Sequence, residues 1–220
     1  MNTAIKNRPA PSTPTHESKR RRRGTWAALM IAALFAATLA AVSAPAAANW
    51  SGASGNTGCS GGVNMTDNKD LYYYRSSLTS YMYSAVAHAL NNEVAPTDIV
   101  VKPEESSAGS GTDIVYYDAD FSTWCGKDWH PDDPSDAGTA YVWGNSSCET
   151  LSGSKCDRND IRFDTSYWGS ASTNARRKVA CHETGHALGL THRSGSCMVT
   201  GSTWNTFFSS HDENHLDSNY

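Results

Sequence analysis

The sequence predicts an α+β domain, in which helices and mixed strands form packed layers. Apolar residues recur at intervals of three and four before residue 91. Short β-branched and aromatic runs follow between residues 99 and 163, and helical patterns return after residue 173. The 220 residues suffice for one such domain. The charged fraction of 18% argues against a coiled coil, and the net charge of −4 gives no reason to expect nucleic-acid binding.

The N-terminal segment differs in composition from the rest of the chain. Residues 1–23 are polar and end in five consecutive basic residues, residues 26–42 carry no charge, and a run of small residues follows. This order is typical of a secretory signal peptide, which we place at residues 1–48. We expect cleavage after Ala48, with Ala44 as the alternative site. An uncleaved signal anchor is the competing interpretation.

Cleavage would leave an acidic domain that contains every cysteine. The signal segment has seven basic residues and one acidic residue, whereas the remaining 172 residues have eleven basic and 21 acidic residues, a net charge of −10. All six cysteines lie in this second part. We therefore expect a secreted, extracellular, disulfide-stabilised protein that has no membrane contact after cleavage. A Gly/Ser-rich arm at residues 49–66 precedes the predicted domain at residues 67–220, and we expect the arm to be loose.

The elements of the domain follow in order along the chain. Helical periodicity predicts a first helix over about residues 69–91, with Asp67 as its N-cap. Short apolar and aromatic runs predict strands at residues 99–101, 113–117, 139–143 and 161–163. A second helix should run from Thr173 to about Leu188. Ser210 should cap a last helix, whose first turn carries two acidic residues.

The most informative segment is 181–192, which reads CHETGHALGLTH. On a helix, His182 and His186 lie one turn apart and share a face, so both imidazoles can bind one ion. Gly189 can end the helix in a left-handed conformation, and the returning chain would bring His192 round as a third ligand. Three protein ligands with one open position are typical of catalytic zinc. A helix with exposed histidines is the alternative.

The neighbouring Glu183 completes a catalytic set. Zinc lowers the pKa of bound water to about 7. Glu183 follows the first ligand directly, so its carboxylate can reach this water and act as general base. A purely structural zinc site has no need of such a carboxylate. The segment therefore predicts a zinc hydrolase in which Glu183 is the catalytic residue.

The same residues carry a resemblance to a known family. Residues 182–192 match the H-E-x-x-H-x-x-G-x-x-H motif of the metzincin zinc metalloproteases. Met198, six residues after His192, resembles their Met-turn. Residues 66–220 resemble small secreted bacterial matrixin-like and snapalysin-like peptidases, although snapalysins have Asp at the position of His192. The resemblance implies a zincin-like domain with a mixed, mostly parallel twisted sheet, an antiparallel edge strand, an active-site helix and a C-terminal helix.

The resemblance also implies a function. We expect a monomeric, secreted zinc endopeptidase that hydrolyses peptide bonds in protein or peptide substrates. Matrixins hold an extended substrate against an edge strand, and main-chain hydrogen bonds suit this role. The corresponding strand here consists of Thr139, Ala140, Tyr141, Val142 and Trp143. The alternatives are a non-catalytic secreted zinc-binding interaction module and a zinc hydrolase of a non-peptide bond.

The six cysteines allow 15 connectivities, of which one is favoured here. A Cys181–Cys197 bridge would tie the zinc helix to the Met-turn. Cys148–Cys156 would close a short Gly/Ser-rich loop, which leaves Cys59–Cys125 as the third pair. Other mixtures, and Cys59 as a thiolate ligand of the zinc, are the alternatives.

Two further segments have open interpretations. The acidic loop at residues 128–136 offers four carboxylates, which either bind Ca²⁺ or are solvated; they are Asp128, Asp132, Asp133 and Asp136. His130 in this loop is a weaker candidate ligand for a second zinc. Residues 200–208 contain three large aromatics that line either a substrate pocket or the core, namely Trp204, Phe207 and Phe208.

Overall fold

A computed structural model describes residues 50–58, 63–119, 123–124, 127–128, 144–164, 168–201 and 203–220. Several predictions fall outside these residues. They concern the signal peptide at residues 1–48, the candidate substrate strand at 139–143, the acidic loop from residue 129 onward, and the Cys59–Cys125 pair.

The largest sheet has four strands in the order β2-β4-β8-β7. The short strand β2 (Tyr73–Arg75) and the longer β4 (Ile114–Ala119) and β8 (Lys155–Asp164) run parallel to one another. β7 (Gly144–Ser152) pairs with β8 in the antiparallel sense and forms one edge of this sheet. The predicted mixed, mostly parallel architecture is therefore confirmed.

Two smaller sheets accompany it. β1 (Asp70–Leu71) pairs in parallel with β3 (Val100–Val101), and β5 (Thr123–Trp124) pairs antiparallel with β6 (Lys127–Asp128).

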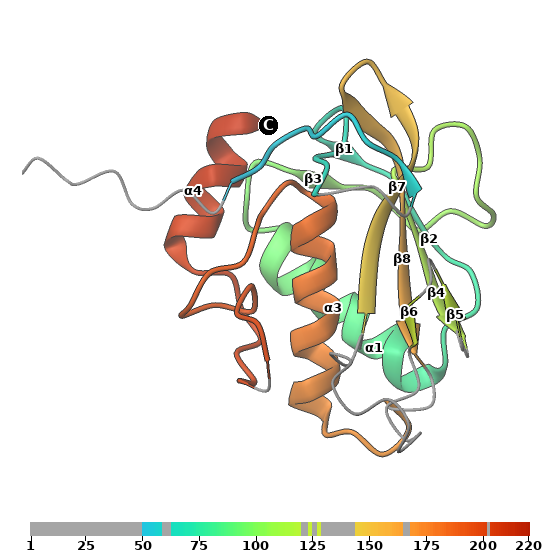
Figure 1. Cartoon of the computed structure of the whole chain (residues 1–220), viewed down its shortest axis with the longest axis vertical. Helices are drawn as coiled ribbons and strands as arrows, with labels where there is room; N and C mark the ends of the chain where they lie inside the picture. Colours follow the sequence, from blue (N-terminus) through green and yellow to red (C-terminus); the bar gives the residue numbers. More distant parts are fainter. Residues whose placement is uncertain are drawn as a thin grey trace, which may run out of the picture. The chain divides into compact units, whose positions relative to one another are not determined.

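Three α-helices are found in the described part of the chain. α1 (Ser80–His88) continues directly into a π-helical turn, η2 (Ala89–Val94). α3 (Thr173–Ala187) lies beside α1 on one face of the sheet, and α4 (Ser210–Asn219) ends the chain (Figure 1). Within the described ranges, no helix is both long and apolar enough to cross a membrane.

The core fills the space between the sheet and the helices. Tyr116 of β4 stacks on Phe163 of β8, with ring centroids 6.4 Å apart, and both side chains are buried. The Tyr116 hydroxyl hydrogen-bonds to Thr184 Oγ1 of α3 across 3.1 Å. The other large, fully buried side chains are Leu71, Met82, Leu90, Ile114, Ile161, Trp168, Leu188, Leu190 and Met198. The core thus fixes α3 against the sheet at the residue that follows Glu183.

The predicted helix over residues 69–91 is wrong in its first part. Residues 70–75 form β1 and β2 instead, and α1 begins only after Thr79. The segment is rich in tyrosine, which favours strands, and its backbone pairs with β3 and β4. Thr79 donates its N–H and its hydroxyl to the Asp118 carboxylate. Asp67 therefore cannot cap this helix, which starts thirteen residues later, at Ser80.

β7 occupies the segment that the sequence pattern suggested was a Gly/Ser-rich loop. Its side chains are mostly polar, and some of them bind β8 in addition to the backbone hydrogen bonds. Arg162 of β8 donates to Ser147 Oγ and to Glu149 Oε1, at 2.7 and 3.1 Å. The Cys148–Cys156 disulfide joins β7 to β8, and Gly153 at φ +64° turns the chain between them. A polar hairpin without apolar alternation gives no strand signal.

The N-terminal arm is packed rather than loose. Trp50 forms a β-bridge with Leu190, and the Met65 N–H donates to the Gly52 carbonyl at 2.8 Å. Asn64 is buried and accepts hydrogen bonds from the Ser54 N–H and hydroxyl. This part of the arm therefore belongs to the folded domain.

The last helix begins one residue earlier than predicted. Ser209, not Ser210, is the N-cap of α4, and it forms a capping box with Asp212.

Candidate metal centre

The turn after α3 brings the three histidines together. The Leu190 N–H donates to the Gly185 carbonyl at 2.9 Å, and the Gly189 N–H donates to the His186 carbonyl at 3.1 Å. These two bonds form a Schellman motif, and Gly189 adopts the left-handed φ of +97° that the motif requires. The predicted stop at Gly189 is therefore observed, and the chain returns so that His192 faces the helix.

The Nε2 atoms of the three imidazoles converge on one point. His186 Nε2 lies 3.1 Å from His182 Nε2 and 3.3 Å from His192 Nε2. Among the described residues, these three form the only group of three or more His, Cys, Asp or Glu side chains close enough to hold one ion.

Backbone carbonyls orient two of the rings. His182 Nδ1 lies 2.8 Å from the Cys197 carbonyl oxygen, and His186 Nδ1 lies 2.7 Å from the Leu190 carbonyl oxygen. Because a carbonyl oxygen can only accept, each Nδ1 carries the hydrogen, and each Nε2 presents its lone pair. Such second-shell bonds are typical of metal-binding histidines.

The spacing fits a tetrahedral ion. Zinc–nitrogen distances of about 2.0–2.1 Å in tetrahedral geometry place two ligand nitrogens about 3.3–3.4 Å apart. The two observed Nε2–Nε2 separations of 3.1 and 3.3 Å are close to this value. Imidazole nitrogens suit zinc, copper, iron and nickel, so the donor set defines a class of ions rather than one element.

The electrostatic environment keeps the histidines in the metal-binding form. Burial, together with the charges of His186 and Lys178, lowers the pKa of His182 to about 2, and burial lowers that of His186 to about 4. Burial also lowers the pKa of His192. All three rings are therefore neutral at pH 7, as metal binding requires.

Glu183 lies at the same site, on the inner side of α3. Its side chain is only 6% exposed. It packs so tightly against β7 that a Cβ on Gly144 would lie 2.8 Å from Glu183 Cγ and 3.0 Å from Oε1. The buried Lys178, one turn earlier, has a pKa that burial lowers and the Glu183 charge partly restores. The Lys178 Nζ also approaches His182 Nδ1 to 3.4 Å.

Met198 lies beneath the helix rather than among the ligand nitrogens. It is fully buried, and a Cβ on Gly185 would lie 2.4 Å from its Sδ. The Cys181–Cys197 disulfide links α3 to the residue before Met198. The two disulfides within the described residues, Cys148–Cys156 and Cys181–Cys197, are two of the three pairs that the sequence favoured.

A cleft of about 280 Å³ opens in front of the histidines. Besides Glu183 and the three histidines, it is lined by Val63, Gly144, Asn145 and Ser146. None of these four residues was predicted from the sequence as part of the site. Gly144, Asn145 and Ser146 directly follow the predicted substrate strand at 139–143 in the sequence, and this position is the signal that could have identified them as cleft residues. Asn145 Oδ1 is buried, and within the described ranges it has no hydrogen-bond partner.

The aromatic residues after Met198 separate into two groups. Phe208 is 3% exposed and belongs to the core, whereas Trp204 and Phe207 are 37% and 48% exposed. The core interpretation therefore holds for Phe208 alone.

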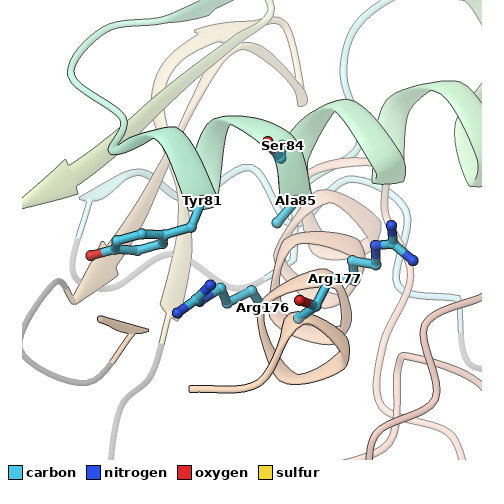
Figure 2. A pocket seen from close by; sticks show the side chains of 6 residues that line it. Tyr81, Ser84, Ala85, Arg176 and Arg177 are labelled. Carbon is cyan, nitrogen blue, oxygen red and sulfur yellow. The ribbon is translucent and has the colours of Figure 1, made fainter. Parts of the chain in front are cut away.

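A second cavity, of about 220 Å³, lies between α1 and α3 and includes Arg176 and Arg177. The two guanidinium groups point away from each other, and Arg176 lies over the Tyr81 ring (Figure 2). Arg176 also donates to the Trp168 and Gly169 carbonyls, so it stabilises the start of α3.

No protein-family model matches the sequence, and no curated protein is significantly similar to it.

Proposed function

We propose that this protein is a secreted, monomeric zinc endopeptidase with a metzincin-like fold. The observation that carries the proposal is the convergence of three neutral histidine Nε2 atoms beside a buried glutamate, at the wall of an open cleft. The antiparallel edge strand β7 and the disulfide below the site support the fold and an oxidising compartment.

His182, His186 and His192 would hold the ion. A bound zinc ion would supply a Lewis acid and lower the pKa of water. Glu183 would accept the proton of the attacking water at its carboxylate and deliver it to the nitrogen of the leaving amine. Packing against Gly144 restricts this carboxylate to one side of the cleft.

The substrate would lie extended along the start of β7. This strand is at the edge of its sheet, and its first three residues line the cleft. Edge strands bind extended peptides through main-chain hydrogen bonds. The Asn145 side-chain oxygen would accept a further hydrogen bond from a substrate amide.

Hydrolysis of casein by the mature chain, with and without a chelator, tests the proposal. We expect cleavage that stops on chelation and returns with zinc. Glu183→Gln should retain the metal and lose about 10²- to 10⁴-fold in rate, because it removes the general base. Glu213→Gln, in the first turn of α4, is the matched control and should keep full activity. Metal binding without cleavage would instead support an interaction module, and cleavage of esters but not peptides would support a non-peptide hydrolase.

A further inference from the structure

A second pair of histidines lies outside the proposed active site, on α4. His211 and His215 are four residues apart, so they share one face of the helix. Their Nε2 atoms are 3.1 Å apart, the ring centroids are 4.5 Å apart, and the ring planes cross at 84°.

This geometry repeats that of the first two histidines of the triad. His182 and His186 are also four residues apart on a helix, with Nε2 atoms 3.1 Å apart, centroids 4.5 Å apart and planes at 82°. A pair of histidines on a helix can adopt many rotamers that keep the rings apart. Here both rings turn their Nε2 edges toward the same point, as two ligands of one ion do.

The surroundings favour an ion at this point. The Trp50 ring stacks on His215, with centroids 6.0 Å apart and planes at 15°, so it limits the rotation of this imidazole while leaving its nitrogen edge free of the stack. Burial is the main cause that lowers the pKa of His215. The charge of Asp212 raises this pKa, whereas the charges of His211 and Arg193 lower it.

We propose that His211 and His215 form a second metal site, which takes a divalent transition ion of the zinc and copper class through both Nε2 atoms. Water would complete the coordination. Such an ion would join two successive turns of α4. Because the Trp50 ring stacks on His215, the bound ion would also stabilise the packing of the N-terminal arm against α4. The inference does not depend on the proposed hydrolysis.

The number of zinc ions bound per chain tests the proposal. After equilibrium dialysis against buffered zinc, we expect two ions in the wild-type chain. His211→Ala and His215→Ala should each bind one, and His186→Ala should also bind one, at α4. A chain with both His186→Ala and His211→Ala should bind none. Asn214→Ala, an exposed change on the same helix, is the matched control and should keep two.

The competing explanation is a direct Nε2–H···Nε2 hydrogen bond between the two rings. It predicts no effect of His211→Ala on metal content, and that result would overturn the proposal. A single ion in the wild-type chain that is lost in His211→Ala would support the α4 site and count against metal binding by the triad. Far-UV circular dichroism of each variant shows whether α4 remains folded. If His211→Ala unfolds, His211→Asn gives the same test with a polar replacement. If the wild-type chain binds two ions but does not cleave casein, the result would count against the proposed function and not against the second metal site.

Discussion

Replacement of Gly189 tests whether the turn after α3 needs a glycine to bring His192 to the candidate metal centre. Gly189 has a φ of +97°, and a Cβ there would lie 2.8 Å from Trp50 Cη2, 2.9 Å from Cζ3 and 3.0 Å from Met65 Cβ. Gly189→Ala therefore adds two costs. The left-handed backbone costs an L-residue about 1–2 kcal/mol. Overpacking against the indole ring costs about 1–3 kcal/mol more.

Gly195→Ala provides the matched control. Gly195 has a similar φ of +87°, but among the described residues no atom outside its chain neighbours lies within 4 Å of its Cβ position, so only the backbone cost applies. For a domain of this size, each kcal/mol lowers the melting temperature by about 2–4 °C. We expect a loss of roughly 2–8 °C for Gly195→Ala and roughly 4–20 °C for Gly189→Ala.

Thermal unfolding should be measured in a chelator, because a bound ion would add stability of its own. The Trp50→Ala background separates the two costs, since removal of the ring should abolish the packing cost and leave the backbone cost. Equal losses for Gly189→Ala and Gly195→Ala would refute the reasoning. So would an undiminished effect of Gly189→Ala when Trp50 is absent.

Two further predictions concern stability. The folded-state pKa values of His182 and His186, about 2 and 4, lie below the ordinary value of 6.5, so between pH 6.5 and 4 the unfolded chain binds more protons. Each histidine should therefore reduce the stability of the chelated protein by about 1.4 kcal/mol per pH unit as the pH falls below 6.5, whereas Asp113, whose pKa burial raises to about 7, acts in the opposite sense. The melting temperature of Asp113→Asn should then fall from pH 7 to 5, and a flat curve in that variant would contradict the prediction. Phe208→Ala should cost about 3–5 kcal/mol because the side chain is buried, whereas the exposed Phe207→Ala should cost less than about 0.5 kcal/mol; urea unfolding measures both, and similar losses would show that exposure does not govern the cost.

The candidate metal centre could be predicted from sequence because its residues lie close together along the chain. Two ligands and the glutamate are fixed by the period of one helix, and Gly189 has one conformational role that sequence can reveal. His192 is only six residues from His186, so the Schellman turn alone brings it back. The parts that sequence reasoning missed are joined by pairing between distant segments.

The error at residues 70–75 shows this limit. Leu71 and Tyr74 fit a helical period, but backbone pairing with residues 100–101 and 114–116 determines their conformation. The polar strand β7 is likewise defined by its partner β8 and by Arg162, not by a pattern of its own. The packing of Trp50 against Gly189 joins residues 139 positions apart, and neither residue signals the contact in sequence.

The Cys181–Cys197 disulfide has a consequence for the choice of metal. The two cysteines directly precede His182 and Met198, and the Cys197 carbonyl also orients the His182 ring. Thiolates bind zinc as well as imidazoles do, and they also attract softer ions such as Cu(I). In the disulfide neither sulfur is a thiolate, so neither cysteine can serve as such a ligand. Among the described residues, an ion at the candidate centre would therefore be selected by the three imidazoles.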